Sequence, residues 1–253
     1  MSEFSVVIVC KNEAENIGRT LESLQGLTDD IVVYDNGSTD GTQVIVHRYG
    51  VRLQEGAWEG FGKTKQKATA LARHDWILSL DADEAIDDEL KQSLLAWRPV
   101  NDLIVYDLSF RNYLGTVYLK YGEWGGDHHI RLFNRNRVNF DQAPVHETLL
   151  MPAGTKVQRL KGFVLHRTMK DIEEYAQKMK DYALLNAEKY FRQGKKSSWF
   201  AIRLSPLFTF INYYILKLGI LDGHAGYICA KMTAWYTFLK YARLKELEKQ
   251  DKS

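Results

Sequence analysis

The apolar residues of the first hundred positions gather in short continuous runs that end beside polar or acidic residues. Three such runs occupy positions 6–10, 31–34 and 76–80. Continuous apolar runs of this length are typical of parallel strands that are buried on both faces. The pattern therefore predicts strands in the interior of an α/β sheet.

Helical patterns lie between these runs. Asn12, with Glu15 three residues later, is an N-cap signature, and apolar residues then recur at helical spacing until Gly26. We expect further helices after Gly41 and over about 61–73. This alternation predicts a doubly wound sheet, in which ligands gather at the carboxyl ends of the strands.

The second half of the chain shows two further patterns. Positions 103–140 predict short β pieces, and the glycines and aromatic residues of 119–126 suit either a loop that covers a ligand or an ordinary surface loop. Beyond His166, Thr168 or Asp171 could cap a long amphipathic helix that ends at Gly194.

The C-terminal part is apolar and basic. Its longest apolar stretch, 204–216, contains Pro206 and is shorter than the ~20 apolar residues that a spanning helix needs. Residues 194–249 contain nine Lys or Arg against three acidic residues. Short apolar helices with aromatic and basic residues suit the surface of an anionic membrane. We favour such a membrane-associating segment over a helical hairpin that packs on the core or on another subunit.

Composition bounds the class of protein. A chain of 253 residues, with 45% hydrophobic and 26% charged residues, suits one sizeable domain with an appended helical segment and excludes disordered or collagen-like proteins. Cys10 and Cys229 are far apart within apolar runs, so neither a disulfide framework nor a thiolate zinc site is expected. No basic region precedes the first apolar run, so we expect no secretory signal and a cytoplasmic protein.

The best candidates for chemistry follow the apolar runs. Asp81 and Asp83 come directly after a predicted buried strand, so both carboxylates can face one site. Mg²⁺ and Mn²⁺ take oxygen ligands, commonly one or two carboxylates plus substrate phosphates, and can neutralise a departing diphosphate. Asp35 is the first polar group after the second run and could accept hydrogen bonds from a base or a ribose.

Phosphatases of the haloacid dehalogenase type offer a rival interpretation, because they also place an acid-x-acid motif after an apolar strand. In those enzymes the first carboxylate is a nucleophile on the first strand, and Thr or Val follows it. Here the motif comes later, and Glu84 and Ala85 follow. An acid-x-acid phosphotransferase stays the alternative enzyme, and a sugar-nucleotide-binding module without catalysis is the alternative from another class.

Three segments together resemble the family-two glycosyltransferases, which have the GT-A fold, in order and approximate spacing. They are Lys11-Asn12-Glu13, Asp35-Asn36-Gly37-Ser38-Thr39-Asp40-Gly41 and Asp81-Ala82-Asp83. The resemblance implies an α/β, GT-A-type doubly wound mixed sheet in a catalytic domain over 1–166. Its nucleotide-sugar half would be 1–100 and its acceptor half 101–166, with a C-terminal helical segment over 167–253.

The resemblance also implies roles in the donor site. Asp35 would contact the uracil of a UDP donor, Asp81 the ribose or the sugar, and Asp83 the Mg²⁺ or Mn²⁺ that bridges the diphosphate. Lys11 and Glu13 would border the same donor site. Lys65 stands where many members carry the Arg of an Ala-Arg-Asn triplet, and it keeps the charge without the bidentate fork.

The acceptor side needs a base. Inverting members use a carboxylate to take the proton of the acceptor hydroxyl as that oxygen attacks the anomeric carbon. The Glu-Asp pair that many members carry has no obvious copy after Asp83, so we choose Glu147, with Asp127 as the second candidate. In several GT-A enzymes a late histidine completes the metal site, and His166 could do so here or be structural.

Within the family, five segments resemble the branch that adds β-linked glucose to the lipopolysaccharide inner core. They are 60–63, 79–84, 131–133, 145–147 and 221–223. The resemblance implies transfer of a hexose, glucose, from a UDP-sugar to a hydroxyl of a lipid-linked saccharide. The protein would be peripheral on the cytoplasmic face of the inner membrane. No nucleic-acid partner is expected, and the chain could form an oligomer.

Overall fold

The computed structural model describes residues 3–141 and 148–251, which divide into two compact units. The first unit takes in the residues up to Phe110 and those from Asp127 to His166. The second takes in Arg111–Gly126 and the residues from Arg167 onward. Residues 111–126 therefore group with the C-terminal helices, and the domain bounds 1–166 and 167–253 stay a prediction.

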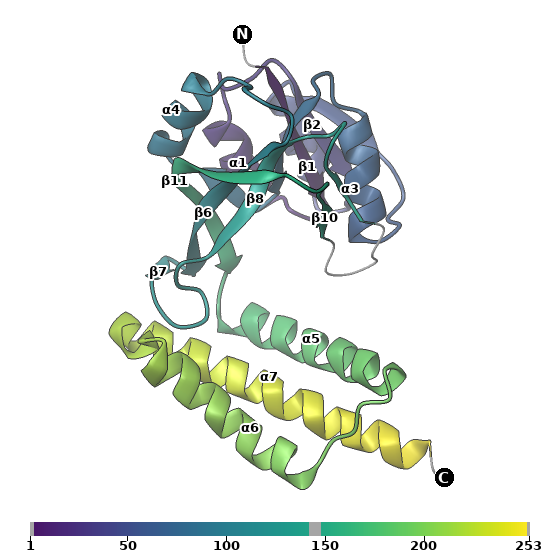
Figure 1. The fold of residues 1–253 in the computed structure, drawn as a ribbon, viewed down its shortest axis with the longest axis vertical. Helices are drawn as coiled ribbons and strands as arrows, with labels where there is room; N and C mark the ends of the chain where they lie inside the picture. Colours follow the sequence, from purple (N-terminus) through teal and green to yellow (C-terminus); the bar gives the residue numbers. More distant parts are fainter. Residues whose placement is uncertain (1–2, 142–147, 252–253) are drawn as a thin grey trace. The chain divides into compact units, whose positions relative to one another are not determined.

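Parallel strands form one half of the sheet in the first unit (Figure 1). Their order is β3-β2-β1-β4, with β1 (Phe4–Cys10), β2 (Ile31–Asp35), β3 (Arg52–Glu55) and β4 (Trp76–Asp81). The three strands predicted from the apolar runs are confirmed. β3 has no apolar run because it is an edge strand with mostly exposed side chains.

Helices cover both faces of these strands, so the doubly wound prediction is confirmed. α1 (Ile17–Ser23), α2 (Thr42–Arg48) and α4 (Asp88–Ala96) share one buried cluster with the even-numbered residues of β1. α3 (Phe61–Ala70) belongs to the cluster on the other face, around Val7. Side chains alternate across a strand, which is why consecutive apolar residues in β1 supply both layers.

The predicted N-cap at Asn12 is wrong. α1 begins at Ile17, and Asn12 adopts a left-handed backbone conformation with a φ of 56°. Its side-chain oxygen instead accepts a hydrogen bond from the backbone N–H of Thr39, at 2.8 Å. The local capping signature therefore gave way to a contact with a segment 27 residues away.

The remaining strands make the sheet mixed, as predicted. β8 pairs antiparallel with β4, and the order continues β8-β6-β11-β5. β6, with 11 residues, is longer than the short pieces expected over 103–140, and β11 has 14 residues. The bounds are β5 (Glu84–Ile86), β6 (Ile104–Leu114), β7 (Val117–Leu119), which pairs with β6, β8 (His128–Asn134), β11 (Lys156–Met169), and a separate ribbon of β9 (Asn139–Phe140) and β10 (Leu149–Leu150).

The second unit is built on helices. α5 (Ile172–Arg192) confirms the long helix predicted after His166: the Asp171 side chain caps it by accepting from the N–H of Glu174, and Gly194 follows its end. Thr168 is not the cap, because it lies in β11 and donates to Asn112 Oδ1 at 2.9 Å.

The two apolar C-terminal stretches form a second pair of helices. α6 (Trp199–Ile211) continues into the π-helical turn η1 (Asn212–Leu216), and the 3-10 turn η2 (Gly219–Asp222) leads into α7 (Gly223–Gln250). Across the described residues, no single helix has the length and apolar character to cross a membrane. The pair 199–216 and 219–250 meets those criteria together, with a bend of 72°.

The glycine- and aromatic-rich segment packs against these helices within the second unit. Gly122 N donates to the carbonyl of Lys217 at 2.9 Å, and Tyr121 N donates to Asp222 at 2.8 Å. The Thr233 hydroxyl donates to Glu123. The segment is therefore a packed part of the helical unit, which neither interpretation of its sequence anticipated.

Asp30 joins three parts of the first unit at the amino ends of its parallel strands. Its carboxylate accepts hydrogen bonds from Ser5 Oγ (2.6 Å), Arg73 N (2.7 Å) and Arg52 Nη1 (2.7 Å). Burial alone would raise the pKa of Asp30, but these donors outweigh it and hold the pKa below its usual value.

We expect Asp30→Ala to lower the free energy of unfolding by about 3 kcal/mol, because it leaves the buried Ser5 hydroxyl and the donors of Arg52 and Arg73 without their charged acceptor. A depressed folded-state pKa contributes stability above the unfolded pKa of about 3.9, and that stability is lost as the pH falls through the folded value. The difference in the free energy of unfolding between wild type and variant should therefore be greatest near pH 7 and shrink in acid. Urea denaturation at several pH values measures this.

The neighbouring residue supplies the control. Asp29 is exposed and its carboxylate contacts His74 at 2.9 Å. Asp29→Ala should leave the free energy of unfolding unchanged at pH 7. An equal loss in the two variants would contradict the role given to Asp30.

Candidate active site

The loops after β1 and β2 are joined at the carboxyl edge of the sheet by side chains of the turn 35–42. Asn12 N donates to Ser38 Oγ at 2.8 Å, Glu13 N to Thr42 Oγ1 at 2.8 Å, and Ala14 N to Asp40 Oδ2 at 3.0 Å. The turn residues thus satisfy backbone groups of the neighbouring loop, as the residue types of such turns allow. This contact fixes the position of Asp35.

Asp35 ends β2 fully buried, and its carboxylate is engaged by the chain itself. Ser38 N (3.0 Å) and Gln43 Nε2 (2.7 Å) donate to one oxygen, and the Ser38 hydroxyl and Cys10 Sγ (3.6 Å) donate to the other. Burial would raise the pKa of Asp35, but the bonds from Gln43 and Ser38 outweigh it and lower the pKa. A carboxylate has about four acceptor positions, so a contact with uracil would replace one of these donors.

Lys11 and Glu13 lie on the loop after β1. The Lys11 side chain is exposed, and Glu13 Oε2 accepts from Asn16 Nδ2 at 2.9 Å. Their contact with a donor stays a prediction.

Asp81 ends β4 between two cations. Lys65 Nζ lies 3.1 Å from one carboxylate oxygen and Arg131 Nη2 lies 3.1 Å from the other. Burial opposes ionisation of Asp81, but the charges of Lys65 and Arg131 outweigh it and hold its pKa far below the usual range. Lys65 comes from α3 and Arg131 from β8, so three elements converge on this carboxylate.

Arg131 and Glu84 were given no role from the sequence, yet they form the base of the site. Glu84 is 1% exposed; it accepts a hydrogen bond from Asp81 N at 2.9 Å and an ion-paired bond from Arg131. Burial raises the pKa of Glu84 to about 7, against the attraction of Arg131. Glu84 directly follows the acid-x-acid motif, which was the one signal for it in the sequence.

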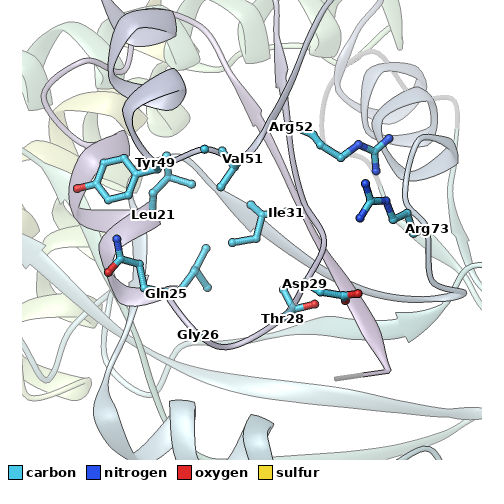
Figure 2. Close-up of a pocket in the computed structure, with 12 residues that line it drawn as sticks. Leu21, Gln25, Gly26, Thr28, Asp29, Ile31, Tyr49, Val51, Arg52 and Arg73 are labelled. Atoms are coloured by element: carbon cyan, nitrogen blue, oxygen red, sulfur yellow. The ribbon is translucent and has the colours of Figure 1, made fainter. Parts of the chain in front are cut away.

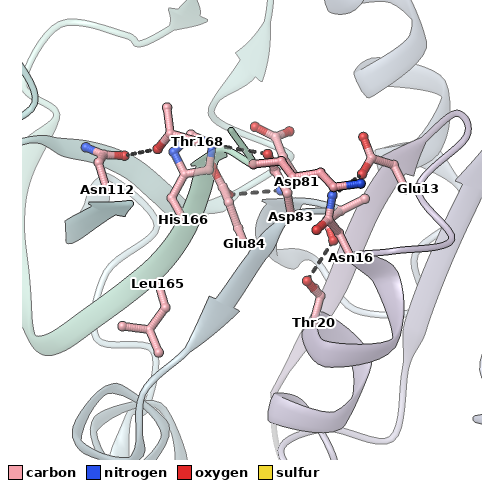
Figure 3. A network of polar contacts seen from close by, with 12 residues as sticks. Glu13, Asn16, Thr20, Asp81, Asp83, Glu84, Asn112, Leu165, His166 and Thr168 are labelled. Carbon is pink, nitrogen blue, oxygen red and sulfur yellow. Dashed lines mark hydrogen bonds and ion pairs between the residues drawn. The ribbon is translucent and has the colours of Figure 1, made fainter. Parts of the chain in front are cut away.

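Asp83 meets His166 across two strands (Figure 3). β5 pairs with β11 so that Glu84 lies opposite His166, which brings His166 Nε2 to 3.3 Å from Asp83 Oδ2. Burial disfavours the protonated ring, but the hydrogen bond and charge of Asp83 outweigh burial and raise the pKa of His166. Two residues that were separate candidates for a metal are therefore adjacent.

These side chains suit a divalent cation only with help from a substrate. Among the described residues, no group of three or more His, Cys, Asp or Glu side chains could hold a metal ion. Asp83 and His166 supply one oxygen and one nitrogen donor, a set compatible with Mn²⁺ and, through the carboxylate, with Mg²⁺. A cation there would need its remaining ligands from phosphate oxygens and water.

A chain of side-chain contacts links Asp127 to His166 within the first unit. Its Oδ1 is 3.0 Å from His129 Nε2, and the His129 ring lies edge-on to Phe110, with ring centroids 4.9 Å apart. Phe110 also contacts the ring of His166, with centroids 6.1 Å apart. The other candidate base, Glu147, lies outside the described residues.

A hollow of about 510 Å³ lies elsewhere in the first unit (Figure 2). Its lining includes Leu21, Tyr49, Arg52 and Arg73, and Ile31 at the start of β2. Because it borders the amino ends of the parallel strands, it is not the place where Asp35 and Asp81 end their strands.

Comparisons with known proteins show the family of this chain. Residues 5–150 match the model of the family described as glycosyl transferase family 2. The chain is 29% identical over 251 residues to the lipopolysaccharide core biosynthesis glycosyltransferase LpsC of Rhizobium meliloti, covering 95% of this chain and 91% of that protein. It is 26% identical over 266 residues to an "uncharacterized glycosyltransferase" of Rickettsia typhi, covering 98% and 88%. Among solved structures, TarS of S. aureus in complex with UDP aligns with a TM-score of 0.46 at 16% identity, covering 99% and 92%.

We expect Arg131→Met to lower the free energy of unfolding by about 3 to 5 kcal/mol, because it leaves the buried carboxylate of Glu84 without its partner. Adding Glu84→Gln should recover part of that loss, since the amide neither buries a charge nor has to take up a proton on folding. Urea denaturation of the two single variants and the double variant measures the coupling. Strictly additive losses would show that the two side chains do not depend on each other.

Proposed function

Because this chain belongs to glycosyl transferase family 2 and is a glycosyltransferase, we propose that it moves a hexose from a UDP-sugar to a hydroxyl of a lipid-linked saccharide, with inversion. Glucose is the proposed sugar, because five sequence segments of this chain resemble the branch of the family that adds glucose. The relative LpsC is named for lipopolysaccharide core biosynthesis, and this supports a saccharide of that kind as the acceptor. Family membership sets aside the phosphotransferase and the non-catalytic module.

The observation that carries the proposal is the meeting of Asp81, Asp83, Lys65, Arg131 and His166 at the carboxyl edge of the sheet. Asp81 is held rigidly by its two cations, and it can accept hydrogen bonds from ribose or sugar hydroxyls through its 38% exposed side chain. Lys65 and Arg131 place positive charge where a diphosphate would lie, so the same pair can position Asp81 and attract the donor.

Asp83 and His166 are the proposed ligands of Mg²⁺ or Mn²⁺. When bound with the donor, such a cation neutralises charge that develops on the departing diphosphate. Binding would replace the direct contact between Asp83 and His166, and the ring would bind in its neutral form. Asp35 and the turn that holds it are proposed to border the base, together with Lys11 and Glu13.

The acceptor oxygen needs to lose its proton as it attacks the anomeric carbon. A carboxylate takes that proton, the new C–O bond forms, and the bond to the diphosphate breaks with its electron pair on the leaving group. Glu147 is the proposed base and Asp127 the alternative. The pair of Asp127 and His129 supports the alternative, because an imidazole beside the carboxylate can orient it.

The proposed location is the cytoplasmic side of the inner membrane. Cys10 and Cys229 are both free thiols, which suits a reducing compartment. Whether the enzyme works as a monomer or an oligomer is decided by sedimentation of the full chain.

We expect Asp83→Ala to abolish the part of UDP affinity that depends on Mn²⁺, because it removes a proposed ligand at the edge of the sheet. Calorimetry with UDP, with and without Mn²⁺, measures this. Asp88→Ala is the matched control, since Asp88 is an exposed acid in the first turn of α4. An unchanged Mn²⁺ dependence in Asp83→Ala would falsify the metal assignment, and hydrolysis of a panel of UDP- and GDP-sugars tests the donor itself.

We expect Glu147→Gln to lower kcat by about 10²- to 10⁴-fold at saturating donor and acceptor, because the amide keeps its shape but cannot accept a proton. Asp127→Asn, measured in parallel, should have a smaller effect. A rise in KM alone would mean lost binding. If Asp127→Asn is inactive while Glu147→Gln keeps near wild-type turnover, the base is Asp127.

A further inference from the structure

One side of α6 and η1 carries a row of exposed apolar side chains, which we call the α6 stripe. Successive members are one, three or four positions apart, a spacing that gathers them on one broad side of the helix. No residue of α6 or η1 is buried. The stripe consists of Trp199, Phe200, Leu204, Leu207, Phe208, Ile211, Ile215 and Leu216, with exposures from 37% to 71%.

The other side of α6 packs against α7 within the second unit. Thr209 and Thr237 are joined by a hydrogen bond of 3.3 Å between their hydroxyls. The rings of Phe210 and Tyr214 both contact Tyr227, at 5.9 and 5.7 Å. The α6 stripe therefore lies outside the core of this unit, and its exposed apolar residues form a group on one helix, unlike single scattered surface residues.

The apolar row continues beyond η1. Leu218, Ile220 and Leu221 are all exposed where the chain bends by 72° toward α7. Leu218 adopts a left-handed backbone conformation, with a φ of 59°, which is unusual for a residue other than Gly, Asn or Asp. The bend therefore keeps aliphatic side chains at the surface of the second unit instead of turning them inward.

The charged residues of the segment that carries the stripe have one sign. Positions 194–221 contain no Asp or Glu, while Lys195, Lys196, Arg203 and Lys217 lie in that segment. Arg203 lies over the ring of Trp199 at 4.7 Å, and Lys217 lies over the ring of Tyr213 at 4.7 Å. Apolar side chains bordered by aromatic rings and cations match the boundary between the headgroups and acyl chains of an anionic bilayer.

We propose that the α6 stripe is a lipid-binding surface that lies in one leaflet of an anionic membrane. A second copy of the chain is a poorer occupant, because two stripes would bring like charges together with no acid in the segment to pair them. Lysine is also depleted at protein interfaces, whereas anionic headgroups pair with it.

The stripe binds along the membrane surface and does not cross it. The 18 residues of α6 and η1 are about 27 Å long at 1.5 Å per residue, and only one side of this helix is apolar and exposed. A helix in this position buries its apolar side among the acyl chains and keeps α7 and the cations toward the headgroups. The advantage to the enzyme rests on the proposed function, since a lipid-linked acceptor is confined to the same surface and its effective concentration rises.

Flotation of the full chain with vesicles tests the proposal. Wild type should float with vesicles of phosphatidylcholine containing about 30 mol% phosphatidylglycerol, and much less with phosphatidylcholine alone. Phe208→Glu/Leu216→Glu changes two of the most exposed stripe residues, at 66% and 71%, and should lower the bound fraction by about tenfold or more. Tyr182→Glu/Leu185→Glu is the matched control on α5, with exposures of 47% and 55%, and should float as wild type does.

Each outcome decides the question. Equal flotation of the two double variants, or equal binding to the two kinds of vesicle, would overturn the proposal. So would a wild type that never floats and sediments as a dimer that Phe208→Glu/Leu216→Glu converts to a monomer. Hydrolysis of UDP-sugars is measured on the same samples. If all of them float as expected but none hydrolyses a UDP-sugar, the proposed function alone is contradicted. If they hydrolyse a UDP-sugar but do not float, the lipid-binding surface alone is contradicted.

Discussion

The buried ion pair between Glu84 and Arg131 is the interaction on which the rest of the site depends. Glu84 is 1% exposed, so its charge needs a partner, and Arg131 reaches it from β8 while also contacting Asp81. The other oxygen of Glu84 accepts from the N–H of Asp81. One carboxylate thus links the end of β4, the start of β5 and a neighbouring strand, and holds Arg131 where it contacts Asp81.

The same constraint brings distant parts of the chain to one place. β5 follows the acid-x-acid motif at once, and its pairing with β11 sets His166 opposite Glu84. His166 therefore reaches Asp83 by strand register, although 83 positions separate them. Side chains brought together in this way are positioned by the fold itself, and charges positioned before the reaction are the ones most useful to catalysis.

The sequence predicted what depends on local pattern. Buried parallel strands, the helices between them and the position of Asp81 and Asp83 at a strand end followed from runs and spacings. Arg131 could not be found in this way, because a single arginine on an amphipathic strand acquires meaning only from partners about 50 positions away. At Asn12 a local pattern was present but misleading. The capping signature predicted a helix start, whereas the Asn12 side chain contacts the turn at Thr39. The α6 stripe shows a third limit, because helical periodicity is the same whether the apolar side faces a core or the outside.

The chain path between the two units has a consequence for how such an enzyme can evolve. The helical unit does not begin only at Arg167: residues 111–126 belong to it, and they arrive and leave through β6 and β8 of the sheet. Backbone bonds from Gly122 and Tyr121 to Lys217 and Asp222 bind that insertion to the C-terminal helices. The C-terminal helices are consequently not an independent module that could be exchanged by itself. Recombination at a single junction would separate the insertion from the helices it packs on, so the two units are expected to be inherited together.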